Sequence, residues 1–336
     1  MVMGIFMNLT KEKRKKKKTN IFSETNRAAK RMDKKRITIF WDMIKCAIKY
    51  KANPNDYYTF KMYEMTKYER LTIITKGINN EYCTKYNNPK YTHFFHNKSE
   101  FNKVFDNYLN RDWLELNGKN KIAFAEFCKK HPVIIAKPSI SQNGNKIEKF
   151  DTTEWKLKDL YEELVENKQT LIEEVIEQCD KLNKLHLESI NTIRVVTLLG
   201  KIVACYLKIG NNHKIVDNYS EEGLIVPIDI HTGSIIYPAV NKYGTTYEHH
   251  PITKKQIVGL QIPRFQEVIE LCENACVEIP EVGYVGWDIV VGSRNCSLLD
   301  ATEFPEHEIY GLPAHREGNV GLLPVFKQAE ERELEQ

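Results

Sequence analysis

The chain has 336 residues, of which 42% are hydrophobic, and a net charge of +4. This length is enough for a large core and two or three subdomains, while no apolar run approaches the roughly 20 residues that a membrane-spanning helix needs. The eight cysteines are scattered without Cys-x-x-Cys pairs, a pattern typical of reduced, buried thiols in a cytoplasmic protein rather than of a zinc site.

The charge is distributed unevenly. Residues 1–51 carry a net charge of +12 and the remaining 285 residues a net charge of −8. Seven of the eight residues in Lys11–Lys18 are cations, and we expect a disordered polybasic tail over residues 1–30. Such a tail can contact an anionic membrane surface, but without interleaved aromatic residues it indicates no specific nucleic-acid partner. No apolar core follows the basic block, so a secretory signal is not expected.

A helical region is predicted over residues 31–90. One amphipathic helix with a basic face is expected over residues 33–50, from the helical spacing of Ile37, Phe40, Trp41, Ile44, Ala47 and Ile48. The tyrosine-rich residues 57–86 are expected to be helical packing surface. Two more helices are expected over residues 97–131, with one apolar face made of Phe101, Val104, Phe105 and Leu109.

The pattern changes to strands at Val133. An apolar strand ends at Lys137, and the polar loop Ser139–Lys146 precedes a return strand. A lysine beside such a loop is suited to hold phosphate, although the loop has only one glycine. After a helix over residues 154–167, strands are expected from Thr170, over 195–199 and over 202–209. Arg194 and Lys208 interrupt these strands, and either converge on an anion or face outward separately.

The segment 284–305 predicts a hairpin of buried strands, each with one aspartate, Asp288 and Asp300. Either the two carboxylates share a divalent cation, for which oxygen ligands favour magnesium or manganese, or both lie at strand ends in water. A helix is predicted over residues 263–278, where Cys272 and Cys276 lie four residues apart and either pack in the core or bind metal.

Six segments together carry a family resemblance: Leu171-Ile-Glu-Glu-Val-Ile-Glu-Gln, Ser189-Ile-Asn-Thr-Ile-Arg, Val216-Asp-Asn, Tyr247-Glu-His-His-Pro, Gln261-Ile-Pro and Tyr284-Val-Gly-Trp-Asp-Ile. With Lys137-Pro, they resemble the ATP-grasp superfamily, specifically the sugar-transfer-associated ATP-grasp proteins related to α-L-glutamate ligases, over about residues 90–310. The resemblance implies an α+β fold in which two α+β subdomains, residues 91–177 and 178–315, clasp a nucleotide. A tail is expected over residues 316–336, with a frayed helix in its glutamate-rich end from Ala329.

The resemblance also implies roles for individual residues. Lys98 and Lys137 would contact ATP, under a lid loop that contains Ser141, Gln142, Asn143 and Gly144. The hinge beside adenine would consist of Glu173, Glu174, Val175 and Ile176. Arg194 and Lys208 would act on the transferred phosphoryl group, and the ligands of Mg²⁺, with Mn²⁺ as the alternative ion, would be Asp288, Asp300 and Thr302.

The implied activity is ATP-dependent ligation of a small-molecule carboxylate to an amine through an acyl phosphate, in cell-envelope or polysaccharide-linked biosynthesis. Two departures from the family pattern favour other activities. The lid is poor in glycine, and Asp300-Ala301-Thr302 stands where the family has Glu-x-Asn, so that either the second magnesium is lost or Glu303 substitutes as a ligand. The alternatives are a degenerate nucleotide-binding scaffold docked to a membrane through Lys11–Lys18, and a phosphotransferase that forms no amide.

Overall fold

The computed structural model describes residues 21–32, 35–140, 146–211 and 223–334. The polybasic run Lys11–Lys18, the predicted lid residues Ser141–Gly144 and the segment Val216–Asn218 lie outside the described residues, so predictions about them stay predictions. In the described ranges, no helix has both the length and the apolar character to cross a membrane.

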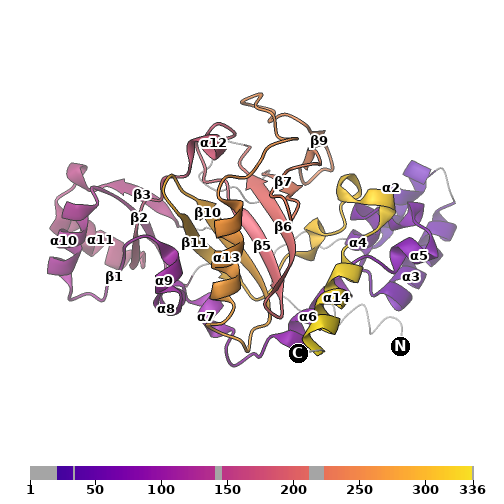
Figure 1. Cartoon of the computed structure of the whole chain (residues 1–336), viewed down its shortest axis with the longest axis horizontal. Coiled ribbons are helices and arrows are strands. Elements are labelled where there is room, and N and C mark those ends of the chain that lie inside the picture. The colour runs from indigo at the N-terminus through magenta and orange to yellow at the C-terminus, as the bar shows by residue number, and fades with distance from the viewer. Residues whose placement is uncertain (1–20, 33–34, 141–145, 212–222, 335–336) are drawn as a thin grey trace.

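The structure has two antiparallel sheets, a larger one at the centre of the molecule and a smaller one toward the end opposite the N-terminal helices (Figure 1). The larger has seven strands in the order β11-β10-β5-β6-β7-β8-β9. Their bounds are β5 Ile193–Leu198, β6 Lys201–Ile209, β7 Leu224–Pro227, β8 Ala239–Val240, β9 Thr246–Tyr247, β10 Tyr284–Val291 and β11 Cys296–Thr302. The hairpin predicted around Asp288 and Asp300 is confirmed as β10 and β11. Leu199 and Gly200, both at positive φ, form the tight turn between β5 and β6.

Both faces of the larger sheet are buried. One face packs on α13 (Phe265–Ala275) and on α7 (His93–His96), α8 (Lys98–Val104) and α9 (Asp106–Leu109), with Trp287 in edge contact with Phe95 and Phe105. Part of the other face packs on α6 (Lys76–Tyr86) and α14 (Leu323–Leu334). Because both faces of the sheet are covered over most of their area, its strands have almost continuously apolar sequences.

The smaller sheet has the order β1-β4-β2-β3. Its strands are β1 Trp113–Glu115, β2 Val133–Lys137, β3 Glu148–Asp151 and β4 Leu171–Glu174. Ile134, Ala136 and Ile172 point toward α10 (Lys121–Lys130) and α11 (Leu157–Glu166), with which they form a separate core. The residues that alternate with them, including Lys137 and Glu173, therefore point away from these helices.

The N-terminal region packs around its own apolar cluster at one end of the molecule (Figure 1). It contains α2 Ile21–Met32, α3 Arg36–Tyr50, α4 Pro54–Thr59 and α5 Lys67–Arg70. Helix α2 begins at Ile21, inside the segment predicted to be a disordered tail. A buried hydrogen bond of 2.8 Å between the His307 Nε2 and the Asp56 Oδ1 links this region to the rest of the chain.

Three other predictions differ from the structure. Helices α7–α9, which were assigned to the smaller subdomain, pack instead on the larger sheet. The predicted C-terminal tail, for which only a frayed helix from Ala329 is expected, forms helix α14 from Leu323 onward, because Leu323, Phe326 and Ala329 are buried against that sheet. In α3, Ile37, Trp41 and Ile48 are exposed, and the buried residues are Ile39, Met43, Cys46 and Tyr50. Both stripes on α3 have helical spacing, so spacing alone did not indicate which one packs inward.

The remaining described elements are short 3-10 or helical turns between these layers: η1 Met62–Glu64, η2 Thr152–Glu154, α12 Asp180–Asn183, η4 His307–Ile309, η5 Pro313–His315 and η6 Glu317–Asn319. Cys272 lies on α13 and Cys276 directly after it, and both pack in the core, as one of the two readings expected: Cys272 is buried, and the Cys276 Sγ lies 3.4 Å from the Thr197 Oγ1. All eight cysteines are free thiols.

Candidate active site

Charged side chains converge where the smaller sheet meets β10 and β11 of the larger one. Because β2 alternates, Lys137 leaves the strand on the side away from α10 and α11. Its Nζ lies 2.6 Å from the Glu173 Oε2, and both residues are almost fully buried. The other Glu173 oxygen accepts hydrogen bonds from the Asn102 amide at 2.9 Å and the Arg111 guanidinium at 3.0 Å.

Burial and neighbouring charges shift the pKa values of this pair. Burial alone would raise the pKa of Glu173, but Arg111 and Lys137 lower it below its usual range. Burial, with the positive charges of Lys98 and Arg111, lowers the pKa of Lys137 to about 8 despite the nearby Glu173. The two predicted nucleotide-binding lysines therefore lie close enough for the positive charge of Lys98 to lower the pKa of Lys137.

Lys98 connects the two sheets. It is the first residue of α8, whose N-terminus is capped by the Asn97 side chain, and its backbone N–H donates to the Ser139 carbonyl at 2.7 Å. Its ammonium forms an ion pair with Asp300 on β11. The lysine thus lies between the loop that follows β2 and the predicted metal site.

Asp288 and Asp300 are cross-strand neighbours in the register of β10 and β11, so their side chains leave the same face of the sheet. Asp288 also lies opposite Arg194 of β5. Arg194 donates from Nε at 2.7 Å and from Nη2 at 2.9 Å to the two Asp288 oxygens, and the Lys208 Nζ lies 2.8 Å from Oδ1. Of the two readings of Arg194 and Lys208, convergence is the one observed, although here on a carboxylate.

The local sequence explains this packing. A Cβ added to Gly286 would lie 3.1 Å from the Arg194 Nη1, so the glycine of the Val-Gly-Trp-Asp segment leaves room for the guanidinium. Burial alone would raise the pKa of Asp288, but Arg194 and Lys208 hold it well below its usual range. The same carboxylate raises the pKa of Arg194 although burial opposes the charge. Both groups are therefore charged at neutral pH.

The other predicted ligands have protein partners. The Thr302 Oγ1 accepts the Phe304 N–H at 3.2 Å. Glu303, the substitute ligand, pairs with the His96 Nε2 at 2.7 Å. Val175 and Ile176, predicted to belong to the hinge beside adenine, are half-buried in the segment after β4, the last strand of the smaller sheet in the sequence.

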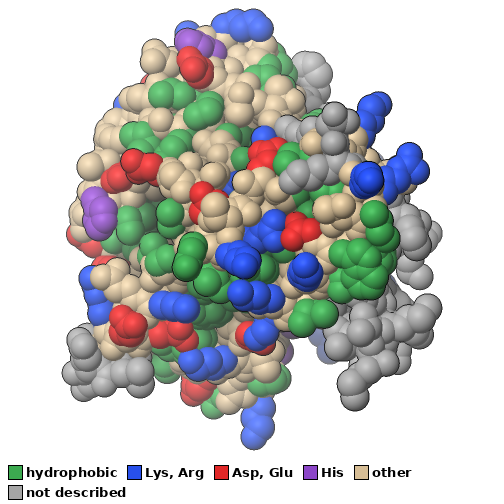
Figure 2. Space-filling model, turned by 90° about the vertical axis from the view of Figure 1, so that its right-hand side faces the viewer, with side chains coloured by type: hydrophobic (Ala, Val, Ile, Leu, Met, Phe, Trp, Pro, Cys, Tyr) green, Lys and Arg blue, Asp and Glu red, His purple; other side chains and the backbone are tan. Residues whose placement is uncertain are grey.

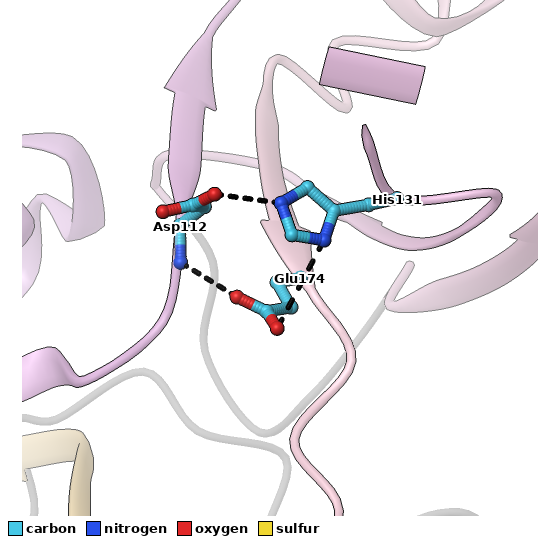
Figure 3. Close-up of side chains that lie close together, drawn as sticks. All are labelled: Asp112, His131 and Glu174. Atoms are coloured by element: carbon cyan, nitrogen blue, oxygen red, sulfur yellow. Dashed lines mark hydrogen bonds and ion pairs between the residues drawn. The ribbon is translucent and has the colours of Figure 1, made fainter. Parts of the chain in front are cut away.

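Glu174 points to the opposite side of the smaller sheet from Glu173. It lies in a cluster with Asp112 and His131 (Figure 3), whose potential ligand atoms are within 4.8 Å of one another. The His131 Nε2 is 2.7 Å from Asp112, Glu174 accepts the Asp112 N–H at 3.0 Å, and Lys130 also pairs with Asp112. These contacts give each of the three side chains a polar partner within the protein. The cluster is separate from the residues around Asp288.

We call the eight residues of the converging group the charged seam: Lys98, Arg111, Lys137, Glu173, Arg194, Lys208, Asp288 and Asp300. Sequence reasoning named all of them except Arg111, which is buried and also donates to the Leu298 carbonyl of β11 at 2.5 Å. The sequence offered no signal for Arg111, because helices are predicted over residues 97–131, where the structure instead has strand β1 directly after Arg111 and Asp112.

The model of the family described as sugar-transfer associated ATP-grasp matches residues 77–309. The chain therefore belongs to the sugar-transfer associated ATP-grasp family, and the predicted family and α+β fold are confirmed. The match begins after α2–α5, which lie outside it. No curated protein matches the chain.

Among solved structures, the chain is similar to the ATP-grasp ligase PsnB complexed with a minimal precursor, at 13% identity and a TM-score of 0.45, over 74% of this chain and 63% of PsnB. It is also similar to the D-cycloserine synthetase DcsG, at 9% identity and a TM-score of 0.43, over 84% of this chain and 82% of DcsG. For a D-alanine–D-alanine ligase from Bacillus anthracis the identity is 14%, the TM-score 0.37 and the coverage 71% and 62%. At these TM-scores the likeness adds nothing to the family assignment.

Proposed function

We propose that the protein is an ATP-dependent carboxylate–amine ligase whose nucleotide lies along the charged seam. Family membership supports nucleotide binding, and the observation that carries the proposal is the convergence of Lys98 and Lys137 with Arg194, Lys208, Asp288 and Asp300. Five cations in the seam face three carboxylates, which leaves a net positive charge where a triphosphate would lie. Such an excess attracts an anion strongly because the site is largely shielded from water.

The two aspartates fit a divalent cation once nucleotide is present. They are cross-strand neighbours with oxygen ligands, the donor type that Mg²⁺ prefers. Without nucleotide, Lys98, Arg194 and Lys208 neutralise them. Phosphate oxygens would attract the same cations, which would free Asp288 and Asp300 for the metal. We therefore expect ATP and Mg²⁺ to bind with positive coupling, and Mn²⁺ to replace Mg²⁺.

The proposed reaction needs no protein nucleophile. A substrate carboxylate attacks the γ-phosphorus, the bond to the β-phosphate oxygen breaks, and ADP leaves. The amine then attacks the acyl carbon of the acyl phosphate, phosphate leaves, and the amine loses a proton. Magnesium, when bound, neutralises charge on the phosphoryl oxygens. Arg194 and Lys208 stabilise negative charge on the transferred group, while Lys98 and Lys137 hold the other phosphates in line.

The substrates belong to the same proposal. The family description associates these proteins with sugar transfer, which supports a small carboxylate and an amine from cell-envelope or polysaccharide biosynthesis in the cytoplasm. We also propose that Lys11–Lys18 makes peripheral contact with an anionic membrane, since each cation near such a surface contributes about 1 kcal/mol.

One observation favours a nucleotide-binding scaffold as the second candidate. Asp300 and Glu303 both have basic partners, and Thr302 offers a weaker oxygen donor than the family's asparagine. A site in which Asp288, Asp300 and Glu303 all stay paired with basic side chains would hold nucleotide with little turnover.

Hydroxylamine separates the candidates. The protein is incubated with ATP, Mg²⁺ and panels of amino acids and sugar acids, and hydroxamate and phosphate are measured. A ligase forms hydroxamate from the carboxylate that is its substrate. When the amine substrate is added, the amine reacts with the acyl phosphate instead. A phosphotransferase forms a phosphorylated product that no amine consumes. The scaffold binds ATP with no product from any panel, which would contradict the ligase proposal.

A further inference from the structure

Helix α3 carries an exposed apolar stripe that the fold does not use. Ile37, Trp41 and Ile48 are 59%, 56% and 68% exposed, and Ile44 between them is half-buried. Their spacing of four, three and four residues puts all four side chains on one face of the helix. Hydrophobic side chains scattered singly on a surface are ordinary, whereas a contiguous stripe of this kind is typical of an interaction site.

The helix is anchored by its opposite side. Ile39, Met43, Cys46 and Tyr50 are buried in the core of the N-terminal region. The exposed stripe is therefore held rigidly outward, and removing its side chains opens no cavity in that core.

The surroundings of the stripe are positively charged. Arg36, Lys45 and Lys49 on the same helix are exposed. The one carboxylate of α3, Asp42, is bound by the Arg70 guanidinium through two hydrogen bonds of 2.8 Å, and also accepts the Tyr57 hydroxyl. The negative charge of Asp42 is thus neutralised by Arg70 within the N-terminal region, while Lys45 and Lys49 stay exposed and available to a partner.

The space-filling view shows the same combination of charge and apolar surface. Figure 2 shows the side of the molecule that carries the N-terminal helices, where Lys and Arg side chains lie beside hydrophobic ones, with some Asp and Glu side chains among them. The sequence upstream adds the seven cations of Lys11–Lys18.

We propose that this face of α3 docks on an anionic lipid bilayer, with Ile37, Trp41, Ile44 and Ile48 inserted between the headgroups. A tryptophan flanked by branched aliphatic residues suits the boundary between headgroups and acyl chains. Long lysine side chains beside the stripe reach the phosphates while their stems cover apolar surface. An apolar stripe bordered by cations is the pattern of interfacial helices. Lipid is favoured over a protein partner because the exposed charged side chains of α3, Arg36, Lys45 and Lys49, are all cations, whereas Asp42 is paired with Arg70.

This docking is independent of the proposed ligase activity. The stripe lies outside the matched residues 77–309 and contains none of the charged seam. It also differs from the contact proposed for Lys11–Lys18, since it adds insertion of apolar groups to electrostatic attraction.

Vesicle sedimentation tests the proposal with the full chain. Binding is measured to vesicles of phosphatidylcholine with about one third phosphatidylserine, and to phosphatidylcholine alone. The wild type is expected to bind the anionic vesicles, and the variant Ile37→Ser/Trp41→Ser/Ile48→Ser to bind at least tenfold more weakly with unchanged ATP-analogue binding. Ile122→Ser, at a 78% exposed residue of α10, is the matched control and should bind as the wild type does. Lys45→Gln/Lys49→Gln should lose affinity for anionic vesicles only.

A second readout follows Trp41 itself. Lipids brominated near the headgroup should quench part of the wild-type tryptophan fluorescence, and Trp41→Phe should remove this quenching while vesicle binding falls only a few-fold. The proposal is wrong if the triple variant binds vesicles as well as the wild type, because Lys11–Lys18 alone would then account for binding. It is also wrong if the wild type does not bind anionic vesicles, or if the triple substitution only converts a dimer to a monomer.

Discussion

Replacing Asp288 by asparagine should destabilise the protein as well as impair its chemistry. The change keeps the shape of the side chain but removes the negative charge that faces Arg194 and Lys208, whose side chains are only 10% and 9% exposed. Removing one partner of a buried ion pair costs about 3–5 kcal/mol, because the remaining charge is left uncompensated. Since the total stability of a protein is about 5–15 kcal/mol, the loss would be a large fraction of it.

Urea denaturation at pH 7 measures this loss, under conditions where Asp288 is ionised because its pKa lies well below the usual range. Asp159→Asn, at an exposed position on α11, is the control and should cost less than about 0.5 kcal/mol. Adding Lys208→Met to Asp288→Asn removes one unpaired cation and should restore part of the stability. A loss below about 1 kcal/mol for Asp288→Asn, or strictly additive effects in the double variant, would refute the buried-pair reasoning.

Three further predictions concern the nucleotide, the metal and the fold. Because the folded-state pKa of Lys137 is about 8, the affinity for an ATP analogue should fall as pH rises from 7 to 9, whereas Lys137→Arg, which stays charged, should bind with a flatter pH profile in calorimetry. Thr302→Asn should lower the Mg²⁺ concentration needed for half-maximal analogue binding several-fold, and an unchanged requirement would remove Thr302 from the metal site. Phe326→Ala should cost about 3–5 kcal/mol in urea denaturation because Phe326 is fully buried against Tyr82, Tyr284 and Tyr310, while Val320→Ala at an exposed position should cost little.

The sequence identified the strands of the site because their signals are local. An apolar strand that ends in Lys137, and a hairpin with one aspartate in each strand, were both recognisable from residue type and spacing. The cross-strand pairing of Asp288 with Asp300 followed from the hairpin itself. The role of Gly286 was not foreseen, since it depends on the position of Arg194 from another strand.

The remaining features could not be predicted because they depend on contacts between residues that are far apart in the sequence. Arg111 precedes a strand and gives no sign in the sequence that it reaches Glu173 and the Leu298 carbonyl. For α14 the sequence predicts only a frayed helical end, because Leu323 and Phe326 become buried only by packing on strands that are distant in the sequence. In α3, two apolar stripes compete, and only tertiary contacts with the neighbouring helices decide which of them is buried.

Calorimetric titration with a non-hydrolysable ATP analogue, with and without Mg²⁺, tests the central claim most directly. We expect the wild type to bind the analogue more tightly with Mg²⁺, and Lys137→Ala to lose most of this affinity while keeping its fold. Binding that is indifferent to Mg²⁺ would contradict the assignment of Asp288 and Asp300 as metal ligands. Absence of binding by the folded wild type would contradict the account of the charged seam as a nucleotide site.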